Sequence, residues 1–147
     1  AMKLRLTKEF RFETSHALDQ YQGLCQNLHG HSYRLFVTVI GEYEEEAENN
    51  DSGMVLDFKA IKTLVEKSVV EDFDHAVVLC KNSSFASALK QTNTKLILFD
   101  KQPTCENLIM EFHRRITSIL PKGIKLARLR LHETETSYAE WLIEDNE

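Results

Sequence analysis

The sequence predicts an α+β protein with a mostly antiparallel sheet. Three observations support this fold class: two alternating segments near the start, two more near the end, and two stretches with helical spacing between them. Alternation of apolar and polar residues is typical of half-buried strands, whereas apolar residues three and four apart indicate amphipathic helices. The predicted order is therefore β-β-α-α-β-β. Short connections pair the strands as hairpins, with both helices on one face of the sheet.

The first two strands form the first predicted hairpin. In the first strand, one parity is apolar and carries Leu4, Leu6, Phe10 and Phe12. A loop over residues 19–28 leads to a second strand, residues 31–43, whose alternating apolar positions are Tyr33, Leu35, Val37 and Val39. Both segments therefore have one face suited to a core.

The two helices lie in the middle of the chain. Asp57 is the expected N-cap of the first, which runs to about residue 70 with an apolar face of Phe58, Ile61, Leu64 and Val65. Residues 80–94 are polar and weakly patterned, ahead of a short apolar run over 96–99. The dipeptide Pro103-Thr104 starts the second helix, whose buried stripe is Leu108, Phe112, Ile116 and Ile119. Residues 121–123 break it, and strands over 125–133 and 137–144 close the chain.

Composition limits the class of protein. The 147 residues, of which 42% are hydrophobic, fit one domain, 1–147, and Ala1 before Met2 is read as a cloning remnant. A net charge of -5 argues against a nucleic-acid binder. Part of the negative charge is concentrated in one segment, which we interpret as a solvated loop containing Glu42, Glu44, Glu45, Glu46, Glu48 and Asp51. No apolar stretch approaches the about 20 residues of a membrane helix, and no signal peptide is evident, so we expect a cytoplasmic protein. Three cysteines suggest no disulfide framework.

Three histidines predict a metal site. His29 and His31 are two residues apart where the chain enters a strand, so both rings face the same side. His16 shares the parity of the apolar residues of the first strand and can meet the pair across the ladder. Three imidazoles with an open fourth position are the arrangement of a catalytic zinc. The alternative is three unrelated polar residues at strand ends.

Three further residues suggest proton transfer. Cys25 precedes His29 by four residues, and a thiol near a cation is more easily ionised, so Cys25 is a base, a nucleophile, a fourth zinc ligand or a small buried filler. Asp74-His75 follows the first helix at a turn, either as an acid-base pair or as a capping aspartate with an exposed histidine. Cys80 reads as packing, and Cys105 as a residue of a first helical turn.

Another three residues suggest ligand binding. Thr104 and Glu106 suit a helix start, as cap and as first-turn acid, which does not exclude a ligand role. Glu133 carries the parity of Ala127, Leu129 and Leu131, which places a carboxylate on an apolar face. Such a carboxylate needs a partner, and a guanidine-like group with two parallel donors would bind it bidentately. Alternatively, Glu133 ends the strand and reaches solvent.

These residues together resemble the 6-pyruvoyl-tetrahydropterin synthase superfamily. The resemblance covers nearly the whole chain in ordered blocks: Phe12-Glu13-Thr14-Ser15-His16, Cys25-Gln26-Asn27-Leu28-His29-Gly30-His31, Val55-Leu56-Asp57-Phe58, Asp74-His75, Pro103-Thr104-Cys105-Glu106-Asn107 and His132-Glu133-Thr134. The Cys-x-x-x-His-Gly-His spacing is closer to the 6-carboxytetrahydropterin synthases of queuosine biosynthesis. Two features depart from the family: residues 80–102 form a longer stretch, whether lid, interface arm or decoration, and Cys105 replaces a smaller hydroxyl residue.

The resemblance implies a fold, a reaction and roles for residues. The fold is the tunnelling fold, assembled into trimers and hexamers around a barrel, with active sites at subunit interfaces. The reaction converts 7,8-dihydroneopterin triphosphate to 6-carboxy-5,6,7,8-tetrahydropterin with loss of acetaldehyde and triphosphate. His16, His29 and His31 would bind Zn²⁺, Cys25 would shuttle protons, and Asp74 with His75 would form a second acid-base arm. Glu133, with Thr104 and Glu106, would bind the pterin.

Two alternatives remain open on the sequence. One is a sister enzyme on the same scaffold, either a 6-pyruvoyl-tetrahydropterin synthase or a pterin aldolase-like enzyme, which only the Cys25 spacing disfavours. The other is a non-catalytic, zinc-stabilised binding module.

Overall fold

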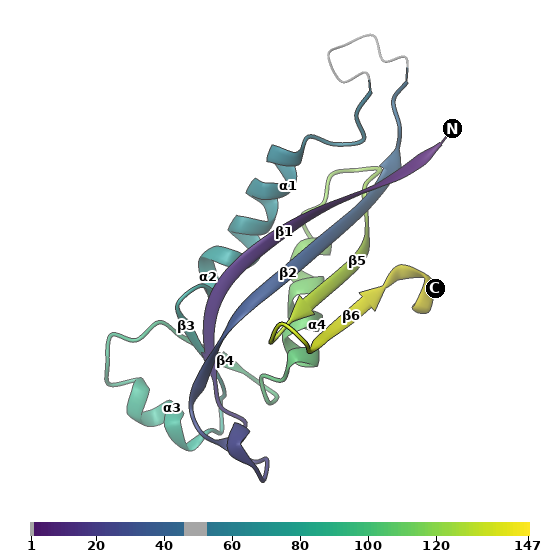
Figure 1. The fold of residues 1–147 in the computed structure, drawn as a ribbon. Helices are drawn as coiled ribbons and strands as arrows, with labels where there is room; N and C mark the ends of the chain where they lie inside the picture. The colour runs from purple at the N-terminus through teal and green to yellow at the C-terminus, as the bar shows by residue number, and fades with distance from the viewer. Residues whose placement is uncertain (1, 46–52) are drawn as a thin grey trace.

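A computed structural model describes residues 2–45 and 53–147 and places six strands of this part of the chain in one sheet (Figure 1). The strand order is β4-β3-β1-β2-β5-β6. The strands are β1 Lys3–His16, β2 His29–Glu42, β3 Ala76–Cys80, β4 Leu96–Phe99, β5 Lys125–His132 and β6 Tyr138–Leu142. Pairs β1–β2, β2–β5 and β5–β6 are antiparallel, whereas β1–β3 and β3–β4 are parallel. The predicted α+β class and mostly antiparallel sheet are confirmed.

A long hairpin of β1 and β2 forms the centre of the sheet. Its register runs without interruption from Lys3 opposite Glu42 to His16 opposite His29. The second strand begins two residues earlier than the sequence suggested, so His29 belongs to the ladder. The predicted alternation holds, because Phe12, Tyr33 and Leu35 are all buried on one face.

Two helical segments cover that face, as predicted. The first consists of α1 Phe58–Val65, a π-helical turn Glu66–Val70 and α2 Glu71–Phe73, and the second is α4 Cys105–Thr117. Both have the expected caps, since Asp57 accepts a hydrogen bond from the Lys59 amide and Thr104 from the Asn107 amide. Together the sheet and these helices enclose one core built mainly from β1, β2, β5, α1 and α4 (Figure 1).

Two residues of the predicted helix stripes are exposed, and Leu64 is only partly buried. Ile119 is 39% exposed because α4 ends at Thr117, so Ile119 lies beyond the last helical turn that faces the core. Phe58 is 51% exposed because it is the first residue of α1 and projects past the end of the sheet-facing stripe. The remaining stripe of α4, which is Leu108, Phe112 and Ile116, is buried as predicted.

The stretch after the first helix contains two strands and a helix that the sequence analysis did not assign. Residues 76–80 form β3, Ser84–Leu89 form α3, and the apolar run over 96–99 forms β4. The run Ala76–Cys80 has no alternation because Val78 and Leu79 are both fully buried, as is usual for a parallel strand covered on two sides. Parallel pairing of β3 with β4 requires a crossover, which residues 81–95 supply.

Other predictions concern the surface. Glu42, Glu44 and Glu45 are exposed, in keeping with a solvated acidic segment, whereas Ala1, Glu46, Glu48 and Asp51 lie outside the described residues. Cys80 is buried and Cys105 is the first residue of α4, as predicted. Within 2–45 and 53–147, none of the helices has the length and apolar character needed to cross a membrane.

The ring of Phe112 yields a test of this core. It is fully buried and packs edge-on against Phe12 and Phe73. Phe112→Ala is expected to lower the free energy of unfolding by about 3–5 kcal/mol through lost burial and an unfilled cavity. Met110→Ala on the exposed side of the same helix should change it by no more than about 0.5 kcal/mol. Urea denaturation followed by circular dichroism measures both, and equal losses would contradict the assignment of the core face.

Candidate metal centre and active site

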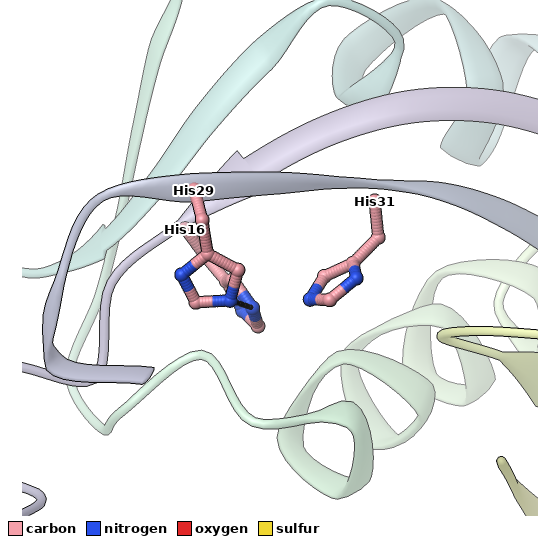
Figure 2. A group of neighbouring side chains, drawn as sticks. All are labelled: His16, His29 and His31. Carbon is pink, nitrogen blue, oxygen red and sulfur yellow. Dashed lines mark hydrogen bonds between the residues drawn. The ribbon is translucent and has the colours of Figure 1, made fainter. Parts of the chain in front are cut away.

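Three imidazoles converge at the closed end of the β1–β2 hairpin. His16 is the last residue of β1 and lies directly opposite His29, the first residue of β2, while His31 lies opposite Thr14. Because side chains alternate along a strand, all three rings point to the same side of the hairpin (Figure 2). One nitrogen from each ring lies within 4.8 Å of the others. The structure thus brings together the three histidines that the sequence singled out.

Backbone carbonyls fix the orientation of two of these rings. The Nδ1 atom of His16 lies 2.8 Å from the carbonyl oxygen of Pro103, and that of His29 lies 2.7 Å from the carbonyl oxygen of Asn27. A carbonyl only accepts hydrogen bonds, so each Nδ1 carries the proton and donates it. In the neutral ring, Nε2 is then left with a lone pair. The sequence did not reveal these two carbonyl partners, because they depend on how the loop and α4 fold back.

This protonation pattern creates a local conflict that a cation resolves. The Nε2 atoms of His16 and His29 lie 3.1 Å apart, and when both Nδ1 atoms are protonated the two lone pairs face each other (Figure 2). Two nitrogens about 2.0–2.1 Å from one tetrahedral zinc would lie about 3.3 Å apart, close to this spacing. The Nε2 atom of His31 is also buried without a hydrogen-bond partner among the described residues. These three nitrogens therefore fit a divalent metal ion.

Burial tunes the same rings toward the form that binds metal. Burial is the main effect that lowers the pKa of His16 and His31, and the neighbouring imidazoles lower it further. The carboxylate of Glu133 opposes this shift in both cases. Since only the neutral imidazole offers a lone pair, a lowered pKa keeps both rings available as ligands.

Glu133 lies at the metal cluster. Its Oε1 atom is 3.3 Å from Nε2 of His16 and 3.3 Å from Nε2 of His31. The residue follows the end of β5, and its amide donates a hydrogen bond to the Ser137 carbonyl in the turn to β6. The carboxylate therefore faces imidazoles here, whereas the sequence suggested only an apolar face or solvent. It is partly exposed, so a ligand can still reach it.

Two polar groups beneath the cluster were not recognised as part of the site from the sequence. Tyr33 counts as a core residue by its alternation, but its buried hydroxyl has no hydrogen-bond partner in the described part of the chain. Burial, with Glu133 and Cys105 nearby, strongly raises the pKa of this phenol. Burial and Glu133 also raise the pKa of the Cys105 thiol to about 11, so this cysteine stays protonated. An unpaired buried hydroxyl of this kind is a signal that only the structure can give.

Cys25, Thr104 and Glu106 occupy the rim. Cys25 is exposed in a short 3-10 turn, Leu24–Gln26, within the loop between β1 and β2. Thr104 caps α4 immediately after Pro103, the residue whose carbonyl accepts from His16, so this helix begins beside the cluster. Glu106 is exposed in the first turn of α4. The structure therefore confirms the capping role of Thr104 and the first-turn place of Glu106.

The Asp74-His75 turn is held in a strained conformation. The carboxylate of Asp74 accepts hydrogen bonds from the Glu13 amide at 2.9 Å and contacts Nδ1 of His75 at 3.0 Å. The Glu13 amide is the main cause of a lowered pKa for Asp74, which burial opposes and His75 reinforces. His75 has φ 65, the one positive value for a non-glycine residue in the described ranges. Such a conformation costs about 1–3 kcal/mol and persists only where neighbouring contacts impose it.

Within one chain, His75 does not join the three histidines. It lines a hollow of ≈ 340 Å³, which His31 also borders, together with Glu13, Ser15 and Ser32. By strand alternation these three residues lie on the face of the hairpin opposite to His16. The predicted acid-base pair Asp74-His75 therefore borders the face of the hairpin opposite to the ring of His16 in a single chain.

Comparison with proteins of known description identifies the family of this chain. The sequence profile described as 6-pyruvoyl tetrahydropterin synthase matches residues 5–144. A 6-carboxy-5,6,7,8-tetrahydropterin synthase of Haemophilus influenzae is 32% identical over 142 residues, which cover 93% of this chain and 97% of the relative.

Solved structures show the same fold. A Wolinella succinogenes protein described as uncharacterized aligns with a TM-score of 0.77 at 17% identity, covering 97% of this chain and 99% of the other. The 6-pyruvoyl tetrahydropterin synthase of Caenorhabditis elegans aligns with a TM-score of 0.67 at 21% identity, covering 96% of each. Because the family profile spans nearly the whole sequence, this chain belongs to the 6-pyruvoyl tetrahydropterin synthase family.

Proposed function

We propose that this chain is a zinc-dependent 6-carboxy-5,6,7,8-tetrahydropterin synthase. It would convert 7,8-dihydroneopterin triphosphate to 6-carboxy-5,6,7,8-tetrahydropterin, acetaldehyde and triphosphate, in the cytoplasm, as a step of queuosine (7-deazaguanine) biosynthesis. One observation carries the proposal: the Nε2 atoms of His16 and His29 lie 3.1 Å apart with their lone pairs directed at each other. A cation between them would resolve this conflict, in a chain that belongs to a family of pterin enzymes. The names of the more similar relatives and the spacing of Cys25 to His29 favour the carboxy product.

The metal would be held by His16, His29 and His31. A bound zinc ion supplies Lewis acidity that polarises the side-chain oxygens of the substrate. The chain's own contribution is to hold Nδ1 of His16 and of His29 against backbone carbonyls, which directs the Nε2 atom of each ring toward the metal position.

The remaining residues have one of two proposed roles, which are binding of the pterin ring and proton transfer. Glu133 can accept hydrogen bonds from the donors on the aminopyrimidine edge of a pterin. The Thr104 hydroxyl already accepts from the Asn107 amide, so its own proton is available for donation to that ring. Glu106 lies two residues further on, exposed in the first turn of α4. Cys25 and the Asp74-His75 pair would move protons at the side chain of the substrate.

A second copy of the chain would complete the site. In one chain His75 borders the face of the hairpin opposite to the rings of His16 and His29, so we infer that the imidazole acting beside the cluster comes from a neighbouring copy. Among the described residues, three stretches of strand have a neighbour on one side only and are open for association: residues 3–13 of β1, the short strand β4, and β6. Edge-to-edge pairing of copies would form the trimer or hexamer, with active sites at the interfaces.

The metal site can be tested by removing one ligand. His29→Ala, a change at a half-buried position, is expected to weaken zinc binding at least about a hundredfold, because the loss of even an outer-shell partner costs up to that amount. His113→Gln serves as the control. His113 lies in α4, and its ring packs on Trp141 of β6, away from the cluster. Zinc content after dialysis against a chelator measures the effect. Full retention of zinc by His29→Ala would contradict the assignment.

The reaction can be tested by product analysis. The zinc-loaded protein should form acetaldehyde and carboxytetrahydropterin from dihydroneopterin triphosphate, detected by mass spectrometry. Cys25→Ala should lower kcat by about 10²–10⁴, the usual contribution of a positioned acid or base, while Leu24→Ala in the same exposed turn should not. A pyruvoyl product would instead indicate the sister enzyme. Metal-loaded protein without any turnover would indicate a binding module.

The shared site can be tested by complementation. Cys25→Ala and His75→Ala chains are co-expressed with different tags, and oligomers carrying both tags are isolated. If each site combines Cys25 of one chain with His75 of another, about a third of the sites in mixed trimers and about a quarter in mixed hexamers are intact, and activity returns to about that fraction. Mixed oligomers as inactive as either parent would show that both groups come from one chain.

A further inference from the structure

Helix α3 is tied to the loop that carries Cys25. One oxygen of Asp19, Oδ2, accepts hydrogen bonds from the Ser83 hydroxyl at 2.8 Å, the Ser84 amide at 2.8 Å and the Ser84 hydroxyl at 3.1 Å. These donors form the start of α3, which packs through Ala86 against the fully buried Ala17. The beginning of the loop is therefore fixed to the crossover between β3 and β4.

The rest of that loop has few other attachments. Residues 20–28 are all exposed, and the turn that contains Cys25 buries no side chain. The amide of Leu18, next to Asp19, donates to the Cys25 carbonyl at 2.8 Å and so closes the loop. The position of the thiol depends on this closure, which in turn depends on Asp19.

The other end of the same crossover is tied to the Asp74-His75 turn. The ammonium group of Lys95 donates to the Asp74 carbonyl at 2.9 Å and also to the Glu71 carbonyl. The adjoining amide of His75 donates to the Glu13 carbonyl at 2.6 Å. The peptide group between Asp74 and His75 is thus held on both sides, and this holds His75 at its positive φ.

We propose that residues 81–95 are a positioning element for both acid-base arms of the proposed enzyme, acting on Cys25 through Asp19 and on His75 through Lys95. The inference rests on the proposed function and gives the long stretch after β3 a role. Asp19 and Lys95 touch no substrate in this proposal. They are positioning residues that set where the thiol and the imidazole stand.

Kinetics provide the first test of the proposal, using the zinc-loaded full chain. Asp19→Ala and Lys95→Met should each lower kcat about tenfold to a hundredfold, the usual cost of a misplaced catalytic group, with KM changed less than about threefold. Asp19→Asn should restore most of the rate, because its amide oxygen can still accept from the Ser84 amide. Matched controls are Ser87→Ala and Lys90→Met, exposed residues of α3 and of its C-cap, which should leave kcat unchanged. Equal losses in the controls, or losses confined to KM, would overturn the proposal.

Amide hydrogen exchange provides a second test that does not require turnover. Asp19→Ala should speed exchange over residues 18–26, and Lys95→Met over 74–76, each without affecting the other arm. Faster exchange confined to the expected arm supports the two attachments, whether or not the wild-type protein converts a pterin. A wild-type protein without turnover would reject the proposed reaction alone. Exchange unchanged in both variants would reject the positioning role.

Discussion

The register of the β1–β2 ladder is the constraint on which the histidine cluster depends. Fourteen residues of each strand pair without interruption, and this pairing sets His16 directly opposite His29. A slip of one residue would move His29 and His31 to the other face, because side chains alternate with a period of two. The same slip would expose Tyr33 and Leu35, which are fully buried. The energy that buries the core therefore also fixes the geometry of the three imidazoles.

The ring orientations add a second level of control. Two carbonyls from separate segments, the loop before β2 and the turn before α4, accept the Nδ1 protons of His29 and His16. Sequence parity could place the histidines on one face, but it could not supply these carbonyls or the approach of Glu133 to within 3.3 Å. It also could not show the unpaired Tyr33 hydroxyl, since an aromatic residue at an alternating apolar position is read as core. Long-range contacts of this kind depend on the tertiary fold alone.

The fold was predictable where one face of an element is buried and the other is solvated. That condition holds for β1 and β2, for the stripe of α4 and for the caps Asp57 and Thr104. It fails for β3, whose five residues are nearly all buried and therefore show no period, and for β4, a four-residue strand at the sheet edge. The parallel pairing of these strands joins segments distant in sequence, which short-range patterns do not report.

The histidine cluster and the two proposed acid-base groups are held by different kinds of contact. The metal cluster is built on the ends of a continuous ladder, and its rings are fixed by carbonyls, so little motion is available to it. Cys25 stands on an exposed loop, and His75 on a strained turn, where strand pairing alone cannot position a side chain. Both outlying groups are instead secured by polar contacts to one crossover segment. In the proposed enzyme, a crossover that parallel pairing of β3 and β4 requires anyway would thus also position the two groups that the ladder does not reach.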